Sequence, residues 1–438
     1  MDKMGFVICS RLKSVRVPNK CLTLINGIPL LGHLLKRVKQ LNLPVILAVP
    51  FDEVDSFKEI ANEYDVTLFS GSEIDPLLRM YDAARDNNLE HVIRVCHDKV
   101  FIDEDLVQDA ISSYFMIGAD YLYSKEFTEG TGFEIISFEA LKKARYRFQN
   151  VEHISYAIKA VAQHIEEHHV PNYAKSDFRL LIDYEKDLLM METILSTLGN
   201  DCTMDDALMF LKANRGLKQL NEIPQVTIYT CAFNADKYIA ECIDSVTAQS
   251  GFENMEYLII DDGSSDKTFY HMAKAAVDFD NVKLFKNHSN KGLAASSNMM
   301  LSKARGRYIM RVDADDYFTS QNSINNMLTK IRSTDFDVIY PDNYFGAMDL
   351  IQQGCENHHI GGALFDTKAL NHVKFTDRLT GHDSLDVYLR SKQFLKTGYL
   401  KEPIFFYRQH EKSLTHMNLE YREAIRQQLI AEAELETN

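Results

Sequence analysis

The stretch that most constrains the fold is an apolar strand that runs directly into a cluster of acids. Residues 308–312 read Tyr-Ile-Met-Arg-Val and predict a buried strand, and Asp313, Asp315 and Asp316 follow it. In open α/β sheets, ligands bind at the carboxyl ends of the strands. Carboxylates held this close repel one another unless a cation neutralises them, and a divalent cation that carries a diphosphate is a usual partner. The stretch therefore predicts a metal–nucleotide site in an α/β domain.

Length and composition limit the alternatives. A chain of 438 residues is too long for one ordinary core, so we expect two domains. The net charge of −15 disfavours nucleic-acid binding. No segment approaches the roughly 20 apolar residues of a transmembrane helix, and no signal peptide precedes the first strand. The seven cysteines lack CxxC spacing and fit reduced thiols, so we expect a cytoplasmic protein.

A strongly basic loop follows the first predicted strand, at residues 5–10. Its cations are Arg11, Lys13, Arg16 and Lys20, with no acid among them. Such a loop could cradle a triphosphate and stabilise the charge that develops as pyrophosphate leaves. The alternative is a solvated basic turn.

Strands and helices then alternate through the first half, which predicts a mostly parallel, doubly wound sheet. Asp98 follows the strand predicted at 92–95, and the apolar run that begins at Phe178 repeats this pattern of a strand that ends in an acid, at Asp183. These two carboxylates could meet to hold one magnesium ion. The histidines of the segment 164–169 have helical spacing, for which a solvated helix face is favoured over a zinc site.

The ordered residues of this half resemble a known family. Ser10-Arg-Leu-Lys-Ser-Val-Arg-Val-Pro-Asn-Lys20, then Leu-Ile-Asn-Gly-Ile-Pro-Leu-Leu-Gly-His33, is similar to the opening of sugar-acid cytidylyltransferases of the spore-coat-polysaccharide and acylneuraminate type. The resemblance implies phosphate contacts from Arg11, Ser14, Arg16 and Lys20, with Arg11 and Lys20 catalytic. It also implies magnesium binding by Asp98 and Asp183.

Three residues depart from the pattern of that family. Lys13 replaces a small residue, His97 a glycine and Val100 a proline. The site is therefore expected either to accept an altered substrate or to have lost its activity.

After a short polar link at 221–225, the strand–helix pattern starts again. Strands are predicted at 226–230 and 256–260, with an amphipathic helix at 236–249 between them. Asp261-Asp-Gly-Ser-Ser-Asp266 follows the second strand, where Asp and Ser are suited to a turn and a helix cap. We therefore expect a second nucleotide-binding domain.

This half resembles family 2 glycosyltransferases of the GT-A fold. The residues that carry the likeness are Val226 to Asn234, Ile260 to Asp266, Asn290-Lys-Gly-Leu-Ala-Ala295 and Asp313-Ala-Asp-Asp316. The resemblance implies that Phe233 and Asp262 contact the nucleoside and that Lys291 and Gly292 lie beside it. Asp315, supported by Asp313, would bind Mn²⁺ or Mg²⁺ on the donor diphosphate.

Two further roles follow from the same resemblance. Asp383 matches the family's general base, although His382 replaces the usual glutamate, and a helix cap is the alternative for Asp383. His410 lies in the closing motif Tyr407-Arg-Gln-His410, where it would reach the diphosphate or metal, unless it is a core histidine. Residues 418–436 predict a terminal helix, with Tyr421, Ile425 and Leu429 on one side.

The sequence thus predicts an α/β protein with two tandem Rossmann-like nucleotide-binding domains, residues 1–221 and 222–438. The expected function is a multifunctional glycan- or polysaccharide-biosynthesis enzyme. The first domain would transfer CMP from CTP to a sugar acid or related acid, and the second would transfer a glycosyl group from a nucleotide-sugar with inversion. Channelled coupling between the two sites is a further hypothesis. The acceptor (glycan, lipid-linked or protein) is open, and the resemblance allows a homodimer.

Two alternatives remain. The first domain could be a degenerate binding or dimerisation module beside an active glycosyltransferase, or the whole chain could be a nucleotide-sugar sensor. Asp313, Asp315 and Asp383 disfavour the sensor, because a sensor needs no base.

Overall fold

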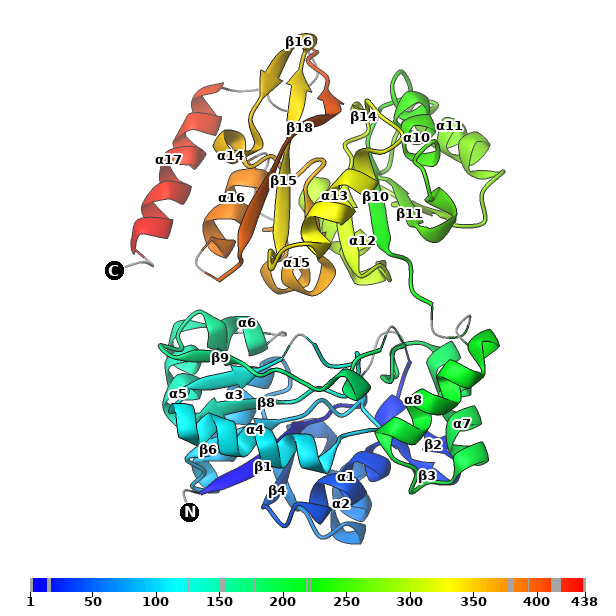
Figure 1. The fold of residues 1–438 in the computed structure, drawn as a ribbon. Coiled ribbons are helices and arrows are strands. Elements are labelled where there is room, and N and C mark those ends of the chain that lie inside the picture. Colours follow the sequence, from blue (N-terminus) through cyan, green and yellow to red (C-terminus); the bar gives the residue numbers. More distant parts are fainter. Residues whose placement is uncertain are drawn as a thin grey trace. The chain divides into compact units, whose positions relative to one another are not determined.

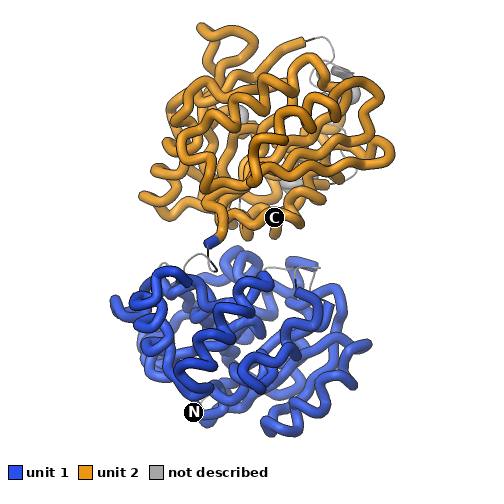
Figure 2. The backbone as a smooth tube through the Cα atoms, turned by 90° about the vertical axis from the view of Figure 1, so that its right-hand side faces the viewer, with its two compact units in different colours: residues 1–222 blue, residues 223–438 orange. Residues whose placement is uncertain are grey.

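The computed structural model describes residues 3–13, 17–124, 126–149, 151, 154–176, 178–217, 220, 222–376, 382–392, 394–410 and 419–435. The chain forms two compact units, Met1–Glu222 and Ile223–Asn438 (Figures 1 and 2). Each unit has its own sheet and its own hydrophobic core.

Unit 1 is built on a sheet of seven strands in the order β5-β4-β1-β6-β8-β7-β9. The strands of this unit are β1 (Met4–Cys9), β2 (Leu24–Ile25), β3 (Ile28–Pro29), β4 (Val45–Pro50), β5 (Thr67–Gly71), β6 (His91–Arg94), β7 (Tyr121–Tyr123), β8 (Glu134–Ser137) and β9 (Ile165–Glu167). Its helices are α1 (Leu30–Gln40), α2 (Val54–Glu63), α3 (Pro76–Asp86), α4 (Glu104–Ile117), α5 (Phe138–Arg147), α6 (Ile154–Lys159), α7 (Glu185–Leu198) and α8 (Met204–Ala213).

The strands β5, β4, β1 and β6 are parallel, and their helical crossovers bury both faces of the sheet. This explains why β1 and β4 read as continuous apolar runs. The carboxyl ends of all four strands therefore meet at one edge, as the sequence predicted. β8 joins β6 in the antiparallel sense, so the sheet is mixed at its other side.

Two predictions for unit 1 were wrong. The apolar run 178–183 does not extend the sheet: it makes only isolated bridges, Lys99 with Leu181 and Glu129 with Arg179. The histidine segment is not helical, because Ile165–Glu167 forms β9 beside β7. His168 is buried within ion-pair distance of Asp109, and His169 is exposed near Glu126.

Unit 2 contains a nine-stranded sheet with the path β12-β11-β10-β13-β17-β15-β18-β14 and with β16 paired to β15. Its strands are β10 (Val226–Ala232), β11 (Glu256–Asp261), β12 (Val282–Lys286), β13 (Tyr308–Arg311), β14 (Tyr317–Phe318), β15 (Val338–Phe345), β16 (Ala347–Gln352), β17 (Leu364–Asp366) and β18 (Thr397–Tyr407). Its helices are α10 (Ile239–Thr247), α11 (Thr268–Ala276), α12 (Leu293–Lys303), α13 (Ser323–Arg332), α14 (Gly354–Asn357), α15 (Thr367–Val373), α16 (Asp383–Ser391) and α17 (Leu419–Leu435).

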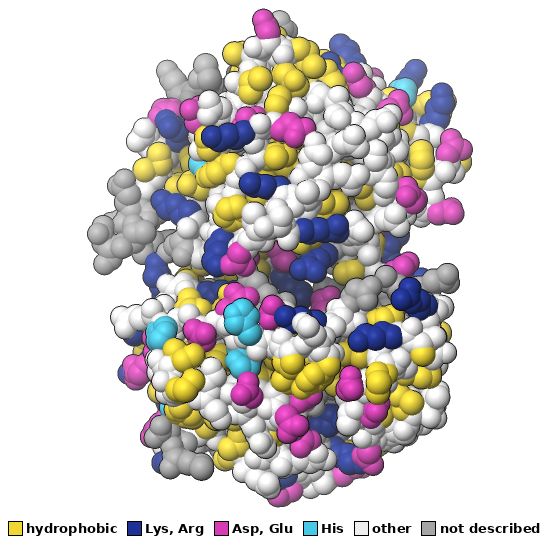
Figure 3. Space-filling view, in the orientation of Figure 1, with side chains coloured by type: hydrophobic (Ala, Val, Ile, Leu, Met, Phe, Trp, Pro, Cys, Tyr) yellow, Lys and Arg dark blue, Asp and Glu magenta, His cyan; other side chains and the backbone are white. Residues whose placement is uncertain are grey.

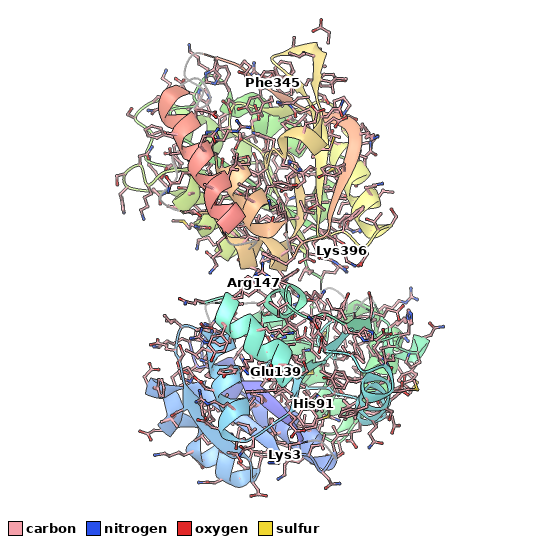
Figure 4. All side chains as sticks on the ribbon, turned by 90° about the vertical axis from the view of Figure 1, so that its left-hand side faces the viewer. Lys3, His91, Glu139, Arg147, Phe345 and Lys396 are labelled. Atoms are coloured by element: carbon pink, nitrogen blue, oxygen red, sulfur yellow. The ribbon has the colours of Figure 1, made fainter. Side chains whose placement is uncertain are left out.

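The strands β10 to β13 are parallel neighbours, and β17 is antiparallel to β13. β15 is antiparallel to β17 and parallel to β18, so β15 and β18 run in the same direction as β13. Figure 4 labels Lys396, just before β18, and Phe345, at the end of β15, at opposite ends of this unit. The residues that follow β10, β11, β13 and β18 therefore lie at a common edge.

The terminal helix α17 lies against α16 (Figure 1). Ile425 and Leu429 are half-buried, which agrees with the predicted apolar side, whereas the side chain of Tyr421 lies outside the described residues. None of the described helices is long and apolar enough to cross a membrane. On the face shown in Figure 3, the basic and acidic side chains of the described residues are interspersed.

Candidate active sites

The first candidate site lies at the carboxyl edge of the parallel strands of unit 1. The loop after β1 carries Arg11, and its backbone is tied to the residues after β4, because Leu12 N donates to Glu53 Oε2 at 2.6 Å. The loop returns to the core through Lys20 and Cys21, both of which are buried. Parallel strand ends thus place this basic loop beside Asp98, which follows β6.

Lys20 brings the two predicted metal ligands of unit 1 together. Its Nζ lies 3.0 Å from Asp98 Oδ2 and 3.3 Å from Asp183 Oδ1, and it donates to Ile182 O at 2.8 Å. Burial lowers the pKa of Lys20, but the two carboxylates outweigh it and hold that pKa above its ordinary value. For Asp98, burial raises the pKa, but the charge of Lys20 leads the opposing effects and the pKa lies below its usual range. The charged Lys20 therefore lies between the carboxyl groups of Asp98 and Asp183.

Backbone contacts fix the segment that supplies Asp183. Ile182 N donates to Asp98 O at 3.1 Å, which holds the two aspartates side by side. Asp187 accepts hydrogen bonds from the backbone N–H groups of Asp183 and Tyr184, at 2.8 and 2.9 Å, where α7 begins. Arg179 lies 3.3 Å from Asp187 and 3.8 Å from Asp183. The sequence analysis missed these supports because neither residue ends a predicted strand.

The other predicted residues of this site have different outcomes. Ser14 and Arg16 lie outside the described residues. Arg11 is half-buried in the loop after β1. Lys13 points to two acids, with Nζ 2.9 Å from Asp52 and also paired with Glu73, and it is largely exposed. It therefore ties the loop to the ends of β4 and β5.

His97 is anchored to the first strand. Its Nδ1 is 3.0 Å from Cys9 O, which makes Nδ1 the donor, and burial lowers the pKa of the imidazole. Its Nε2 has no hydrogen-bond partner among the described residues. The imidazole therefore fills space at the strand end that a glycine would leave open.

In unit 2, Asp262 binds the loop that precedes α12. Its Oδ1 accepts hydrogen bonds from Asn287 Nδ2 at 2.7 Å and Lys291 N at 3.0 Å, and its Oδ2 accepts from Gly292 N at 2.9 Å. Asp262 N donates to Ala232 O at 2.8 Å, so Phe233, which follows Ala232 in the chain, leaves its strand beside Asp262; Phe233 is 48% exposed. The structure thus brings the four predicted nucleoside-side residues to one strand edge.

The acidic loop after β13 is covered by the residues that follow β18. His410 Nε2 lies 2.9 Å from Asp315 Oδ2, and its ring stacks on Tyr238. Burial, followed by the charge of Asp313, raises the pKa of Asp315. Arg408 donates from Nε to Asp315 O at 2.8 Å and from its backbone N to Asp316 Oδ1 at 2.9 Å. His410 therefore lies at the predicted metal site, and Arg408, which the sequence analysis missed, fixes the loop.

Arg311 connects the acidic loop to the predicted base. Its side chain is 2% exposed, its Nε lies 2.8 Å from Asp313 Oδ1, and its Nη1 donates to Asp383 Oδ2. Burial raises the pKa of Asp383, but Arg311 outweighs this effect and the pKa lies below its ordinary value. The helix-cap alternative for Asp383 is wrong, because His382 is the N-cap of α16 and Asp383 is the first residue of the helix. The sequence analysis gave Arg311 no role, although an arginine inside an apolar strand is a signal that could have indicated this pair.

His359 is a further residue that the sequence analysis missed. Its Nδ1 lies 3.2 Å from Gly361 O, and its ring packs against Phe405 and Tyr407. Burial lowers its pKa, and the charges of Asp313 and Asp383 act in the opposite direction. The neutral imidazole thus lies beside the acidic loop.

The donor sets of both sites fit a magnesium-like ion. No group of three or more His, Cys, Asp or Glu side chains in the described part of the chain could hold a metal on its own. Mg²⁺ is usually bound through one or two carboxylates together with substrate phosphates, so a complete protein cage is not required. Asp98 with Asp183, and Asp315 with His410 and Asp313 nearby, meet that requirement.

Comparisons with known proteins give separate family matches for the two halves of the chain. Residues 6–227 match the family model described as cytidylyltransferase, and residues 227–392 match that of glycosyl transferase family 2. An uncharacterized glycosyltransferase of Haemophilus influenzae is 34% identical over 116 residues, which cover 26% of this chain and 35% of that protein. The putative glycosyltransferase EpsE of Bacillus subtilis is 40% identical over 98 residues, which cover 22% of this chain and 35% of that protein. The chain thus spans about a third of the length of these curated relatives.

Solved structures also align with the chain. A cytidylyltransferase from Leptospira borgpetersenii aligns over 50% of this chain and 97% of its own, with 24% identity and a TM-score of 0.45. Residues 1–349 of S. aureus TarS in complex with UDP-GlcNAc align over 48% of this chain and 66% of their own, with 17% identity and a TM-score of 0.44. From the two family matches, the chain belongs to the cytidylyltransferase family through residues 6–227 and contains a family 2 glycosyltransferase domain at residues 227–392.

Proposed function

We propose that the chain catalyses two reactions of glycan biosynthesis, one at each site. The observation that supports this most strongly is that each strand edge gathers its own set of carboxylates and cations, with Asp98, Asp183 and Lys20 in unit 1 and Asp313, Asp315 and Asp383 in unit 2. Structural domains rarely need several carboxylates at a strand edge, whereas nucleotide chemistry does.

In unit 1, the proposed reaction is the transfer of CMP from CTP to a sugar acid or related acid. An oxygen of the acid attacks the α-phosphorus, a new P–O bond forms, and pyrophosphate leaves. Arg11, Ser14, Arg16 and Lys20 would stabilise the triphosphate and the departing pyrophosphate. A magnesium ion on Asp98 and Asp183 would supply Lewis-acid stabilisation of the phosphates.

In unit 2, the proposed reaction is glycosyl transfer with inversion from a nucleotide-sugar. Asp383 accepts the proton of the acceptor hydroxyl while the hydroxyl oxygen bonds to the anomeric carbon. The bond from that carbon to the nucleoside diphosphate breaks, and the nucleoside diphosphate leaves. Phe233, Asp262, Lys291 and Gly292 would hold the nucleoside. Asp315, Asp313 and His410 would hold Mn²⁺ or Mg²⁺, which neutralises the leaving diphosphate.

The two reactions would use different donors. A CMP-linked product carries one phosphate, whereas the acidic loop of unit 2 is suited to a cation that bridges a diphosphate. The two sites would therefore serve one glycan through separate activated sugars rather than pass a single donor between them. Transfer by unit 2 from the CMP-linked product of unit 1 would contradict this point.

An alternative is that unit 1 is a non-catalytic module, which the positions of Lys13 and His97 favour. Pyrophosphate release from CTP, measured with candidate sugar acids and Mg²⁺ on the full chain, distinguishes the two functions. Release that is lost in Asp98→Ala supports the two-enzyme function, and no release with any acid favours the alternative. For unit 2, transfer that persists in Asp383→Asn would refute the proposed base.

A further inference from the structure

Lys20 has no spare hydrogen-bond donor in unit 1. Its ammonium contacts Asp98 Oδ2, Asp183 Oδ1 and Ile182 O at 3.0, 3.3 and 2.8 Å. An ammonium has three N–H groups and accepts no hydrogen bond, so these three contacts use its whole capacity. In this arrangement Lys20 cannot also donate to a phosphate.

The ammonium lies where a cation would have to bind to use both carboxylates. The Lys20 side chain is 7% exposed, and those of Asp98 and Asp183 are 18% and 22% exposed. Two positive charges on the same pair of carboxylates would lie within a few ångströms of each other, and like charges that close disfavour one another. Lys20 therefore competes with any divalent cation for this pair.

Hydrogen bonds hold the backbone segments that carry the two carboxylates. The backbone of Asp183 is fixed by Asp187, and that of Asp98 by Ile182. Lysine has a flexible four-carbon stem, so its ammonium can move without movement of the backbone. The ammonium of Lys20 can therefore leave the pair of carboxylates without a change in the backbone.

We propose that Lys20 is an exchangeable counter-ion, whose ammonium and a divalent cation occupy the Asp98–Asp183 pair in turn. This inference rests on the proposed function of unit 1. When the pair binds a divalent cation, Lys20 leaves it and its three N–H groups become available to the triphosphate. The lysine that neutralises the empty site thus becomes a phosphate ligand only after the metal has bound.

Mn²⁺ binding to the full chain tests the exchange without any measurement of activity. The experiment uses a background with Asp313→Asn and Asp315→Asn, so that the proposed site of unit 2 does not contribute, and free Mn²⁺ is followed by electron paramagnetic resonance. Lys20→Met should bind Mn²⁺ about tenfold more tightly or better, because the competing charge is gone. Lys20→Arg keeps the charge and should not show this gain. Lys39→Met removes an exposed lysine that pairs with Asp65 and is the matched control.

The outcomes separate the inference from the function on which it rests. If Asp98→Asn abolishes Mn²⁺ binding and Lys20→Met strengthens it, both stand. If Asp98→Asn abolishes binding but Lys20→Met leaves it unchanged or weakens it, the metal site stands and the exchange is refuted. If Asp98→Asn has no effect, the proposed metal site itself is wrong.

A second measurement needs no substitution at Lys20 and covers the case in which that variant does not fold. Amine-reactive acetylation of the native chain, followed by peptide mass spectrometry, reports how accessible each lysine is. Mn²⁺ without nucleotide should increase acetylation of Lys20 severalfold and leave that of Lys39 unchanged. Equal labelling of Lys20 with and without Mn²⁺ would overturn the exchange.

Discussion

The guanidinium of Arg311 donates to the carboxylate of Asp383 from inside the core of unit 2, although 72 positions separate the two residues in the chain. The same guanidinium pairs with Asp313, so one buried cation holds both the proposed base and the support of the proposed metal ligand. Removal of one partner from a buried ion pair is costly, because the other charge is left uncompensated.

Replacement of Arg311 by Met should therefore reduce both stability and turnover. We expect the free energy of unfolding of unit 2 to fall by roughly 3 kcal/mol or more. We also expect kcat for transfer to fall more than the donor KM rises, because Arg311 orients the base rather than the nucleoside. Asp386→Asn, a buried acid on the same helix that pairs with Arg390, is the control and should reduce stability without this selective loss of kcat. A variant Arg311→Met with normal kcat would contradict the proposed role.

Gly263 and Gly251 form a matched pair for testing the loop around Asp262. Both have positive φ, +78° and +80°, where a side chain costs about 1–2 kcal/mol. A Cβ at Gly263 would lie 2.6 Å from the backbone carbon of Ser289, whereas a Cβ at Gly251 would meet nothing within 4 Å. Gly263→Ala should thus displace the loop that ends at Lys291 and Gly292 and weaken nucleotide binding. Gly251→Ala should lower only the melting temperature, and equal nucleotide affinities would argue against a nucleoside site here.

His410 should matter for the metal of unit 2 rather than for the nucleoside. Its Nε2 lies 2.9 Å from Asp315 Oδ2, so it can bind the ion or orient its ligand. We expect His410→Ala to weaken Mn²⁺ binding by about 10- to 100-fold, as is typical of groups that hold a metal ligand in place. Binding of the nucleoside monophosphate, which lacks the diphosphate, should change little. Unchanged Mn²⁺ affinity would refute the metal-site role of His410 and favour its alternative interpretation as a core histidine.

Removal of metal should abolish transfer by unit 2. Arg408 donates its Nε to the backbone O of Asp315, and Arg311 pairs with Asp313 and Asp383, so neutralisation of the leaving diphosphate falls to the proposed metal ion. Chelation by EDTA should therefore stop transfer, and Mn²⁺ or Mg²⁺ should restore it. Full activity after chelation, with metal content verified, would refute the metal-dependent mechanism.

The pair Arg94–Glu134 should make unit 1 sensitive to acid. Burial raises the pKa of Glu134, but Arg94 and the hydrogen bonds from Ser155 and Tyr121 lower it to about 2. Because the folded-state pKa lies below that of the unfolded chain, the stabilisation is complete above about pH 4.5 and is lost as the pH falls toward 2. The shift corresponds to on the order of 3 kcal/mol.

The substitution Glu134→Gln tests this assignment by calorimetry. The variant should be less stable than the parent at pH 7, and the difference between the two should shrink between pH 4.5 and pH 2. Lys39→Met affects only a surface pair and should show a small difference throughout the same range. A difference in stability between Glu134→Gln and the parent that stays constant from pH 4.5 to pH 2 would show that the Glu134 carboxylate does not titrate as stated.

Much of the fold follows from local sequence pattern. Strands that are buried on both faces, such as β1 and β11, are largely apolar runs, and the acid that ends β11 marks the carboxyl edge of the sheet. Asp262, Lys291 and Gly292 were predicted to lie together from the resemblance to family 2 glycosyltransferases, and Asp262 does accept hydrogen bonds from the other two. Local pattern gave the wrong result for residues 178–183, where an apolar run packs beside Asp98 through isolated bridges. Hydrophobic periodicity indicates which residues are buried, but it does not identify the strand or helix against which they pack.

The parts that the sequence did not reveal depend on long-range contacts. That Lys20 donates to both Asp98 and Asp183 depends on segments far apart in the chain, and no spacing rule reports it. His359 precedes β17, which pairs with β13, and Arg408 follows β18, which β17 and β15 separate from β13, so tertiary packing sets the positions of both residues. Arg311 could have been singled out, since a buried charge in an apolar strand requires a partner.

The most direct test of two nucleotide sites on one chain is a thermal-shift measurement on the full chain with Mg²⁺ or Mn²⁺ and either CTP or a nucleotide-sugar diphosphate. A ligand that binds only the folded state raises the melting temperature. We predict that Asp98→Asn removes the shift caused by CTP and keeps the shift caused by the nucleotide-sugar, and that Asp313→Asn with Asp315→Asn does the reverse. A CTP shift that survives in Asp98→Asn and disappears in the unit 2 variant would contradict the two-site account.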